Sequence, residues 1–399
     1  MVEGEAGWIY IALLLLGGLL ILVVGGERFL RGASRMAESA GLSPLWVGIL
    51  IALFTAAPEA ALVFSPVILD VIGAGGLAPA SAGGEATEIV QVGQNRFIEV
   101  VSQSSLLLAK FGEDLPIAIV VGSSIVNTLL VTTFTVFLWA VAFRSRNESE
   151  GVEQAVHITL DTVFRDGIIL LGASWLLIWF VYRGGTLEIQ DGALLLGGLL
   201  FYFVNSFATE RSLVAAGAQP KFRRVVNEGS RYSGGVWFNL IVGSFALVVG
   251  SLLVMVALAG WINNLDDGIS PRETLNAITL TLIVFFTALP EIVTIFLAAL
   301  RRQPEIASGN FIASSIVNIF GVLGLAAILQ PSGVPIAIGS FFHFDLAVLT
   351  LGVVLLVIFL FTELRLTLLE AMALFFLYVA YATIRYSGNA PDVTFGGGV

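Results

Sequence analysis

Long apolar runs dominate the chain, and short polar or glycine-rich stretches separate them. A helix needs about 20 mainly apolar residues to cross about 30 Å of hydrocarbon. By this criterion the sequence predicts membrane-spanning helices near residues 8–26, 44–70, 116–143, 166–182, 191–208, 235–262, 273–300, 307–329, 343–362 and 366–386. The pattern therefore predicts an all-α membrane protein with ten transmembrane helices.

Composition supports the same class. Of the 399 residues, 57% are hydrophobic and only 12% are charged, whereas soluble domains carry about 25% charged residues. The formal net charge of -10 argues against a nucleic-acid partner, because nucleic-acid binding needs a basic surface. The chain has no cysteine, which excludes disulfides and thiolate metal sites.

Basic residues are distributed unevenly among the predicted loops. When they are assigned to alternate sides of the ten helices, fourteen of the nineteen Lys and Arg residues fall on one side. By the positive-inside rule that side is cytoplasmic, so we expect a multi-pass protein of the cytoplasmic membrane with both termini outside. The acidic start of the chain lacks the basic region of a cleavable signal peptide, and the first apolar run is expected to be retained.

One pair of short segments occurs twice in the chain. The sequences TAAPE at 55–59 and SSIVN at 123–127 recur as TALPE at 287–291 and SSIVN at 314–318. Because the order is the same in both halves, we interpret the pairs as an internal duplication. Five spans per half is an odd number, so the second half is expected to cross the membrane in the opposite sense. In such inverted repeats, ion sites lie near the bilayer midplane where interrupted helices meet.

The duplication also predicts the domain organisation. Residues 1–208 form the first five-helix repeat and 235–386 the second, with a cytoplasmic linker at 209–234 and a disordered tail at 387–399. The first copy carries about 41 more residues between its two motifs, which predicts an extracytoplasmic insertion at about 73–115. Helical periodicity in its second part favours a surface helix or, alternatively, a lid over the outer vestibule. The KFRR group of the linker fits either attraction to anionic lipid or a topological anchor.

Each T-A-x-P-E segment places a glutamate inside an apolar run. A charge there costs about 2.5 kcal/mol or more unless it has a partner, so Glu59 and Glu291 call for a functional explanation. The alternative is a glutamate that ends a helix at the membrane surface. The preceding proline removes a backbone donor and interrupts the helix. In a membrane, such irregular backbone is tolerated only where it is buried in protein or lines a cavity.

Small oxygen-bearing side chains accompany the two glutamates at i, i+4 spacing, which places each pair on one helix face. Hard cations such as Ca²⁺ take six to eight oxygen ligands, and two carboxylates balance one Ca²⁺ or two monovalent cations. The predicted cation ligands are Thr55, Glu59, Ser123, Asn127, Thr287, Glu291, Ser314 and Asn318. For the neutral residues the alternative is packing, because small polar side chains also join membrane helices.

At these segments the chain resembles the sodium/calcium exchanger family of the cation/Ca²⁺ exchanger superfamily. The two α-repeats of that family carry a G-[TS]-S-x-P-E type motif and a G-S-x-x-x-[ND] type motif, and the resemblance covers nearly the whole chain. It implies two inverted five-helix repeats in which Glu59 and Glu291 are the shared carboxylates, with the two threonines beside them. It further implies Na⁺ sites at the first serine of each SSIVN segment and central ligand positions at each asparagine.

The chain departs from the family motifs at five positions. Phenylalanine replaces the first motif glycine and alanine replaces the motif serine in both copies, and alanine replaces a second-repeat glycine; these residues are Phe54, Phe286, Ala56, Ala288 and Ala313. The resemblance implies a secondary antiporter that exchanges Ca²⁺ for Na⁺ by alternating access, with helices 1 and 6 sliding across the others. The departures keep H⁺-coupled Ca²⁺ antiport and Na⁺/H⁺ antiport open as alternatives.

Other classes of function fit the sequence less well. A cation channel, the remote alternative, would need a ring of filter groups from repeated subunits, and an enzyme would need a base, a nucleophile or a metal triad. The sequence shows neither pattern. We therefore expect inorganic cations as substrates, the lipid bilayer as the environment, and no cofactor or catalytic residue. Whether the protein is a monomer or a homo-oligomer is left open by the sequence.

Overall fold

The computed structural model describes residues 5–60, 62–64, 115–144, 163–215, 217, 233–265, 283–301, 303–330, 332–336, 340–364 and 366–387. The expected insertion, apart from its last residue, lies outside the described residues, as do the KFRR group and the tail beyond residue 387. The surface helix, the lid and the disordered tail therefore stay predictions.

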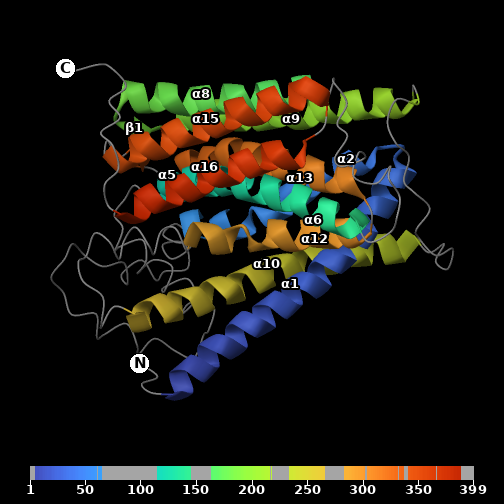
Figure 1. Ribbon diagram of the computed structural model, residues 1–399, viewed down its shortest axis with the longest axis horizontal. Helices are drawn as coiled ribbons and strands as arrows, with labels where there is room; N and C mark the ends of the chain where they lie inside the picture. Colours follow the sequence, from blue (N-terminus) through green and yellow to red (C-terminus); the bar gives the residue numbers. More distant parts are fainter. Residues whose placement is uncertain are drawn as a thin grey trace.

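Helices make up almost all of the described structure (Figure 1). The first half contains α1 (Glu5–Ser39), α2 (Pro44–Thr55), α5 (Leu115–Ile125), α6 (Thr132–Arg144), α8 (Ile168–Arg183) and α9 (Ile189–Ala215). The second half contains α10 (Ser233–Leu265), α12 (Leu289–Leu300), α13 (Pro304–Ile316), α14 (Leu323–Leu329), α15 (Ser340–Glu363) and α16 (Leu368–Ser387). Three π-helical turns, η3 (Val126–Val131), η4 (Val163–Gly167) and η5 (Val317–Val322), interrupt or precede these helices, and strands β1 (Thr186–Leu187) and β2 (Val334–Pro335) form an antiparallel pair.

Among the described residues, eight helical segments are long and apolar enough to cross a membrane, and Pro44–Ala60 and Leu289–Leu300 are shorter apolar helices. An all-helical membrane fold is therefore confirmed. Two helices run further than predicted: α1 continues past residue 26 to Ser39, and α9 continues through 209–215, which we expected in the linker. Arginine and glutamate favour helix, so a helix need not end where its apolar run ends.

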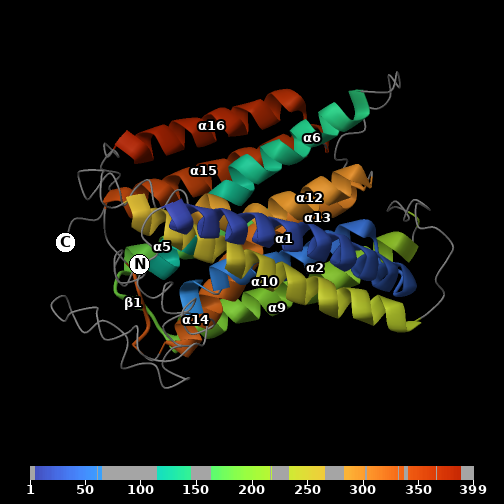
Figure 2. The same cartoon turned by 90° about the horizontal axis from the view of Figure 1, so that it is seen from below.

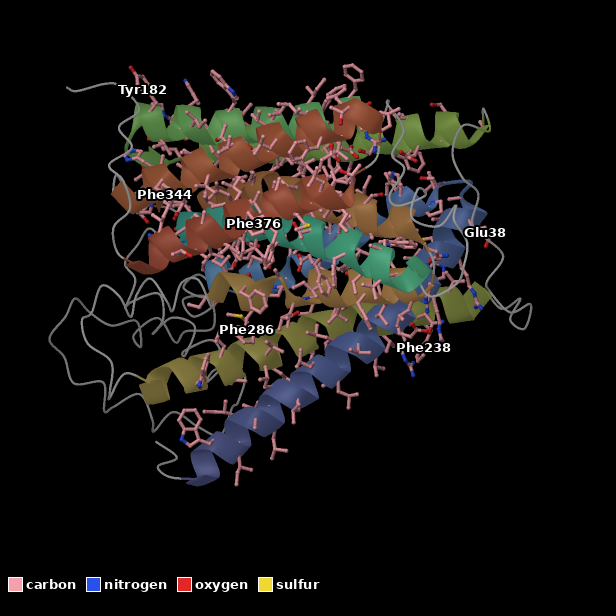
Figure 3. The ribbon with its side chains drawn as sticks, viewed as in Figure 1. Glu38, Tyr182, Phe238, Phe286, Phe344 and Phe376 are labelled. Carbon is pink, nitrogen blue, oxygen red and sulfur yellow. The ribbon has the colours of Figure 1, made fainter. Side chains whose placement is uncertain are left out.

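The described helices end at two opposite ends of the bundle (Figure 1). Strand β1, between α8 and α9, pairs with β2, between α14 and α15, so these two connections share one end. Tyr182 and Phe344 lie toward that end, whereas Glu38 and Phe238 lie toward the other (Figure 3). The ten-helix topology with alternating sides stays a prediction.

Helices α1 and α10 pack along each other at one side of the bundle (Figures 1 and 2). Gly18, Gly25 and Gly32 follow one another at seven-residue intervals on the face of α1 that contacts α10, and a Cβ on Gly25 would lie 2.7 Å from the Cβ of Ala246. Such small residues let membrane helices approach closely. The opposite face of α1 carries exposed leucines, among them Leu13, as expected for contact with lipid.

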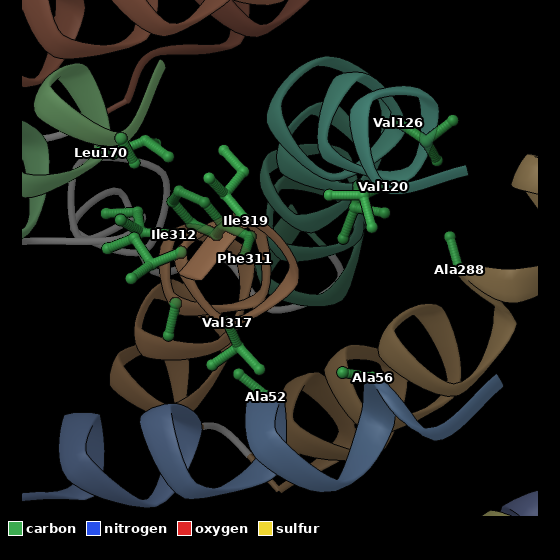
Figure 4. Packing of buried hydrophobic residues seen from close by; sticks show 14 of the residues in the cluster. Ala52, Ala56, Val120, Val126, Leu170, Ala288, Phe311, Ile312, Val317 and Ile319 are labelled. Atoms are coloured by element: carbon green, nitrogen blue, oxygen red, sulfur yellow. The ribbon is translucent and has the colours of Figure 1, made fainter. Parts of the chain in front are cut away.

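Helices α2 and α13 make a second close contact, inside the bundle. A Cβ on Gly48 would overlap the carbonyl of Ile306, and a Cβ on Gly309 would overlap the carbonyl of Leu45. Buried apolar side chains of α13 and η5 fill the space between α2 and α5 (Figure 4). This contact brings the helix that carries the first T-A-x-P-E segment against the helix that carries the second SSIVN segment.

Candidate cation-binding site

Both T-A-x-P-E segments interrupt their helices in the same way. Helix α2 ends at Thr55, and the next residue, Ala56, has φ −71° and ψ 2°, while Ala288 before α12 has φ −78° and ψ −1°. Beyond the break, the N–H of Ala60 donates to Ala56 O at 3.0 Å and the N–H of Ile292 donates to Ala288 O at 3.1 Å. The predicted interruption is confirmed, and it lies two residues before each proline. Proline can neither donate to nor accommodate the carbonyl of the preceding turn.

The SSIVN segments share a second backbone irregularity. Helices α5 and α13 pass into the π-helical turns η3 and η5, each of which begins one residue before Asn127 or Asn318. In both turns the asparagine carbonyl accepts a hydrogen bond from an N–H five residues later, that of Thr132 or Leu323. Single π turns inside α-helices occur frequently at functional sites.

The structure buries every predicted ligand. Each of the eight predicted ligands has 0% of its surface exposed: Thr55, Glu59, Ser123, Asn127, Thr287, Glu291, Ser314 and Asn318. Glutamate is almost never fully buried in proteins unless it is paired. The alternative interpretation, a glutamate that ends a helix at the membrane surface, is therefore wrong for Glu59 and Glu291.

Side chains from both halves of the chain meet at Glu59. Ser123 Oγ donates to Glu59 Oε1 at 2.5 Å, and Asn318 Nδ2 donates to Ser123 Oγ at 3.1 Å. The hydroxyl of Thr287 also lies beside the Glu59 carboxyl. A residue of the first copy thus has neighbours from both SSIVN segments and from the second T-A-x-P-E segment.

The neighbours of Glu291 are the residues that correspond, in the other copy of the motif, to the neighbours of Glu59. Thr55 of the first copy and Ser314 of the second lie beside its carboxyl, which is also close enough to Glu59 for the two charges to interact. The structure therefore brings seven of the eight predicted residues together around two carboxyls. Asn127 is buried at the position that matches Asn318, but no hydrogen bond joins it to this group among the described residues.

Several oxygens of this group lack a hydrogen-bond partner in the described part of the chain: Glu59 Oε2, both carboxyl oxygens of Glu291, Asn127 Oδ1 and Asn318 Oδ1. Buried polar atoms normally have a partner, and an uncompensated buried charge costs several kcal/mol. Carboxylate, amide and hydroxyl oxygens are the ligands that Ca²⁺ and other hard cations prefer. The unpartnered oxygens therefore fit a cation that enters and leaves.

The hydroxyl hydrogens of the two threonines are used by backbone carbonyls. Thr55 Oγ1 donates to Ile51 O at 3.1 Å, and Thr287 Oγ1 donates to Val284 O at 2.8 Å. A hydroxyl has one hydrogen and two lone pairs, so each hydrogen is used within its own helix. The lone pairs remain available for a cation bound beside the neighbouring carboxyl.

Reasoning from the sequence missed two residues beside the site, Asn310 and Thr294. Ser314 Oγ donates to Asn310 Oδ1 at 3.1 Å, and Asn310 Nδ2 donates to Thr294 Oγ1 at 3.1 Å. The corresponding positions of the first copy hold Ile119 and Leu62, so the duplication gave no sign of them. The i, i+4 spacing of Asn310 and Ser314 on α13 could have revealed the asparagine.

A buried ion-pair group that was also missed lies where α2, η4 and α9 meet. Arg165, which directly precedes the predicted span 166–182, bonds Asp166 at 2.6 Å and Glu210 at 3.0 Å, and Ser43 donates to the other Glu210 oxygen. The Arg165 side chain is 4% exposed. This contact explains why residues 209–215 continue α9 instead of forming the start of a linker.

Comparison with known proteins agrees with the fold and the duplicated motifs. Residues 237–387 match the family model described as sodium/calcium exchanger protein. The sodium/calcium exchanger MaX1 of Methanosarcina acetivorans is 25% identical over 413 residues, which cover 94% of this chain and 98% of MaX1. The chain is thus similar to the sodium/calcium exchanger family, in its second half by the family model and along nearly its whole length by MaX1. Members of this family are membrane transporters, as the motif resemblance implied.

Further proteins match along nearly the whole length of the chain. CaxA of Alkalimonas amylolytica is 23% identical over 386 residues, covering 93% of this chain and 97% of CaxA. A solved structure of the sodium-calcium exchanger NCX_Mj superposes with a TM-score of 0.61 at 19% identity, covering 94% of this chain and 99% of that one. The chain therefore shares the fold of NCX_Mj.

Proposed function

We propose that the protein is a secondary antiporter that exchanges Ca²⁺ for Na⁺ across the cytoplasmic membrane by alternating access. The observation that carries this proposal is the pair of fully buried carboxyls, Glu59 and Glu291, with oxygens that lack partners among the described residues. Two carboxylates balance one Ca²⁺ or two Na⁺. Because both ions would use the same oxygens, binding of one excludes the other, and this exclusion couples the two fluxes.

The relatives support the same substrates. MaX1 and NCX_Mj are both named as sodium/calcium exchangers. Glu59 and Glu291 would be the charged ligands, and Thr55, Ser123, Thr287, Ser314, Asn127 and Asn318 would complete the coordination. The cation is the transported substrate, so the site must release it as well as bind it, and mostly neutral ligands favour release.

We infer that ten helices form two inverted repeats, residues 1–208 and 235–386, with both termini outside. The directions of the motif helices support this inference. Helix α2 begins beside Ser43, which bonds Glu210 near the end of α9, whereas α12 ends beside Arg301, which bonds Glu27 of α1 at 2.6 Å. Helix α2 begins shortly after α1 ends, and the Arg301 contact at the end of α12 joins the second half of α1, so α2 leaves that end of the bundle and α12 approaches it.

Alternating access needs one group of helices that moves relative to the site. Helices α1 and α10 fit this role because they pack closely on each other, along the glycines of α1, at one side of the bundle. They contact the motif helices α2 and α12 on their inner side. We expect the pair to slide as a unit across the two motif helices and to open the site to each side in turn.

H⁺-coupled Ca²⁺ antiport is the second candidate, and one observation favours it. Ala56 and Ala288 are buried at the two helix breaks, beside the carboxyls, where the family motif has serine. Two hydroxyl ligands that could hold Na⁺ are therefore missing, while both carboxyls, which can carry protons, are present. The two candidates differ only in the ion that drives Ca²⁺ movement.

Flux through reconstituted vesicles tests both candidates. The full chain is placed in liposomes, and uptake of radioactive Ca²⁺ is measured first under a Na⁺ gradient and then under a pH gradient. We expect Na⁺-driven uptake that is abolished by Glu59→Gln and by Glu291→Gln. Glu38→Gln, the same chemical change at an exposed position of α1, serves as the control and should leave uptake unchanged. Unaltered Ca²⁺ movement in both site variants would contradict the assignment, and uptake driven only by pH would favour the second candidate.

A further inference from the structure

A chain of hydrogen bonds leads from the candidate site into the contact between α12 and α13. Ser314 Oγ donates to Asn310 Oδ1 at 3.1 Å, Asn310 Nδ2 donates to Thr294 Oγ1 at 3.1 Å, and Thr294 Oγ1 donates to Glu291 O at 2.9 Å. All of these side chains are buried, with at most 1% exposed. The chain begins and ends at residues of the second T-A-x-P-E and SSIVN segments, but its two middle members lie outside both segments.

The chemistry of the groups fixes the direction of every bond in this chain. A backbone carbonyl can only accept, so the single hydroxyl hydrogen of Thr294 is used by Glu291 O. Thr294 can then only accept from Asn310, which places the amide nitrogen of Asn310 toward Thr294 and its carbonyl oxygen toward Ser314. Ser314 must therefore donate its own hydrogen to Asn310. Ser314 also lies beside the Glu291 carboxyl, and its two lone pairs remain for a cation bound there.

The first copy of the motif has no such chain. Ile119 stands in the place of Asn310 and Leu62 in the place of Thr294. Ser123, the counterpart of Ser314, donates its hydrogen to Glu59 Oε1 at 2.5 Å instead. A cation bound by Glu59 would require this hydrogen to turn away, whereas the hydrogen of Ser314 already points away from the site. The two halves thus differ in the orientation of the serine hydroxyl: that of Ser314 can bind a cation without turning, and that of Ser123 cannot.

We propose that Asn310 is a positioning residue for cation binding: it holds the Ser314 hydroxyl with its lone pairs toward the site, so that Ser314 is a preorganised ligand and Ser123 is not. The inference rests on the proposed function, because it concerns how that site takes its cation. Groups fixed in the binding geometry bind more tightly, since less freedom is lost on binding. Asn310 would therefore act on affinity through Ser314 and not by touching the ion.

A double-mutant cycle tests this dependence. Ca²⁺ affinity of the purified full chain is measured by calorimetry for the wild type, Asn310→Leu, Ser314→Ala and the double variant. We expect Asn310→Leu to weaken binding on the order of tenfold, the equivalent of one hydrogen bond, with little change in the maximal flux per folded transporter. On the Ser314→Ala background the same substitution should have no further effect, because coupled residues are not additive.

Two further variants separate positioning from general damage. Ser315→Ala is the matched control: its hydroxyl lies on the same helix but bonds Ser124 O at 3.4 Å, so Ca²⁺ affinity should not change. If Asn310→Leu does not fold, Thr294→Val removes the acceptor of the Asn310 amide while keeping the side-chain shape. We expect it to weaken binding only when Ser314 is present.

The outcomes distinguish this inference from the proposed function. Additive losses in the cycle, or wild-type affinity in Asn310→Leu or in Ser314→Ala, would overturn the positioning role and leave the antiporter proposal standing. A wild-type protein that binds no Ca²⁺ would overturn the proposed function, and the present inference with it. Reduced maximal flux at unchanged affinity in Asn310→Leu would also reject positioning, because it indicates structural damage.

Discussion

Replacing Glu291 with glutamine is expected to stabilise the ion-free protein while removing its response to Ca²⁺. The Glu291 side chain is fully buried, it faces Glu59, and neither of its oxygens has a partner among the described residues. Two unit charges about 5 Å apart repel each other by about 3 kcal/mol at an effective dielectric constant of 20, and the two carboxyls are close enough for their charges to interact. The amide that replaces the carboxyl is itself buried without partners, which destabilises the protein by about 1–3 kcal/mol. Since the substitution also removes a buried charge, we expect a net gain of about 2 kcal/mol in the free energy of unfolding.

Glu210 offers the same chemical change with the opposite expectation. It too has 0% exposure, but Arg165 donates to one of its oxygens at 3.0 Å and Ser43 donates to the other. Glu210→Gln removes a charged partner from a buried guanidinium. Hydrogen bonds to charged groups contribute about 1.5–3 kcal/mol, so we expect a loss of about 2 kcal/mol. Asp166 still compensates Arg165, which keeps the loss below that of breaking the whole group.

Thermal unfolding of the purified protein in detergent measures both effects, first with a chelator and then with Ca²⁺. For the wild type, Ca²⁺ at about 100 times Kd should add about 2.7 kcal/mol to stability. Glu291→Gln should unfold at a higher temperature than the wild type in chelator and should show no shift with Ca²⁺. Glu210→Gln should unfold at a lower temperature and keep the Ca²⁺ shift. A lower ion-free unfolding temperature for Glu291→Gln, or a retained Ca²⁺ shift, would refute the reasoning.

Three further predictions concern packing, ion coupling and the contact between helices. Gly48→Leu should lower the unfolding temperature strongly because its side chain would overlap the backbone of α13, whereas Gly172→Leu, which has no atoms near its added Cβ, should not; circular dichroism melts would show this. Ala56→Ser with Ala288→Ser should raise the ratio of Na⁺-driven to pH-driven Ca²⁺ flux if missing hydroxyls weaken Na⁺ coupling; an unchanged ratio would contradict this. Arg301→Ala removes a partly exposed ion pair with α1, so it should cost less than about 1 kcal/mol in stability but change the rate of exchange in vesicles.

Features that depend on local chemistry could be predicted from the sequence. A proline in an apolar run predicts an interrupted helix whatever surrounds it, and both T-A-x-P-E segments show the break, at Ala56 and Ala288. A glutamate in such a run needs a partner or a function, and both glutamates lie inside the bundle. Because the motif occurs twice, the sequence also indicated which distant segments meet. These arguments needed no knowledge of helix packing.

Features that depend on long-range packing could not be predicted. Arg165 lies between a polar stretch and the predicted span 166–182, a position that favours a cytoplasmic loop. Its partner Glu210 lies 45 positions away, and both side chains are buried. Asp345 and Arg385, whose side chains are 3.2 Å apart near the outer ends of α15 and α16 by the predicted topology, pair across 40 positions in the same manner. Sequence spacing gives no indication of such pairs, because the helices that carry them meet only in the folded bundle.

The two copies of the motif have kept the same backbone but not the same hydrogen bonds. In the structure the hydrogen of Ser123 compensates Glu59, whereas nothing among the described residues compensates Glu291 in this way. If the site takes Ca²⁺, the bond between Ser123 and Glu59 has to break, and the bond between Ser314 and Asn310 does not. The difference in free energy between the ion-free and ion-bound states would then depend mainly on the first copy. A duplicated site can therefore have one half that is ready for the ion and one half that responds to it.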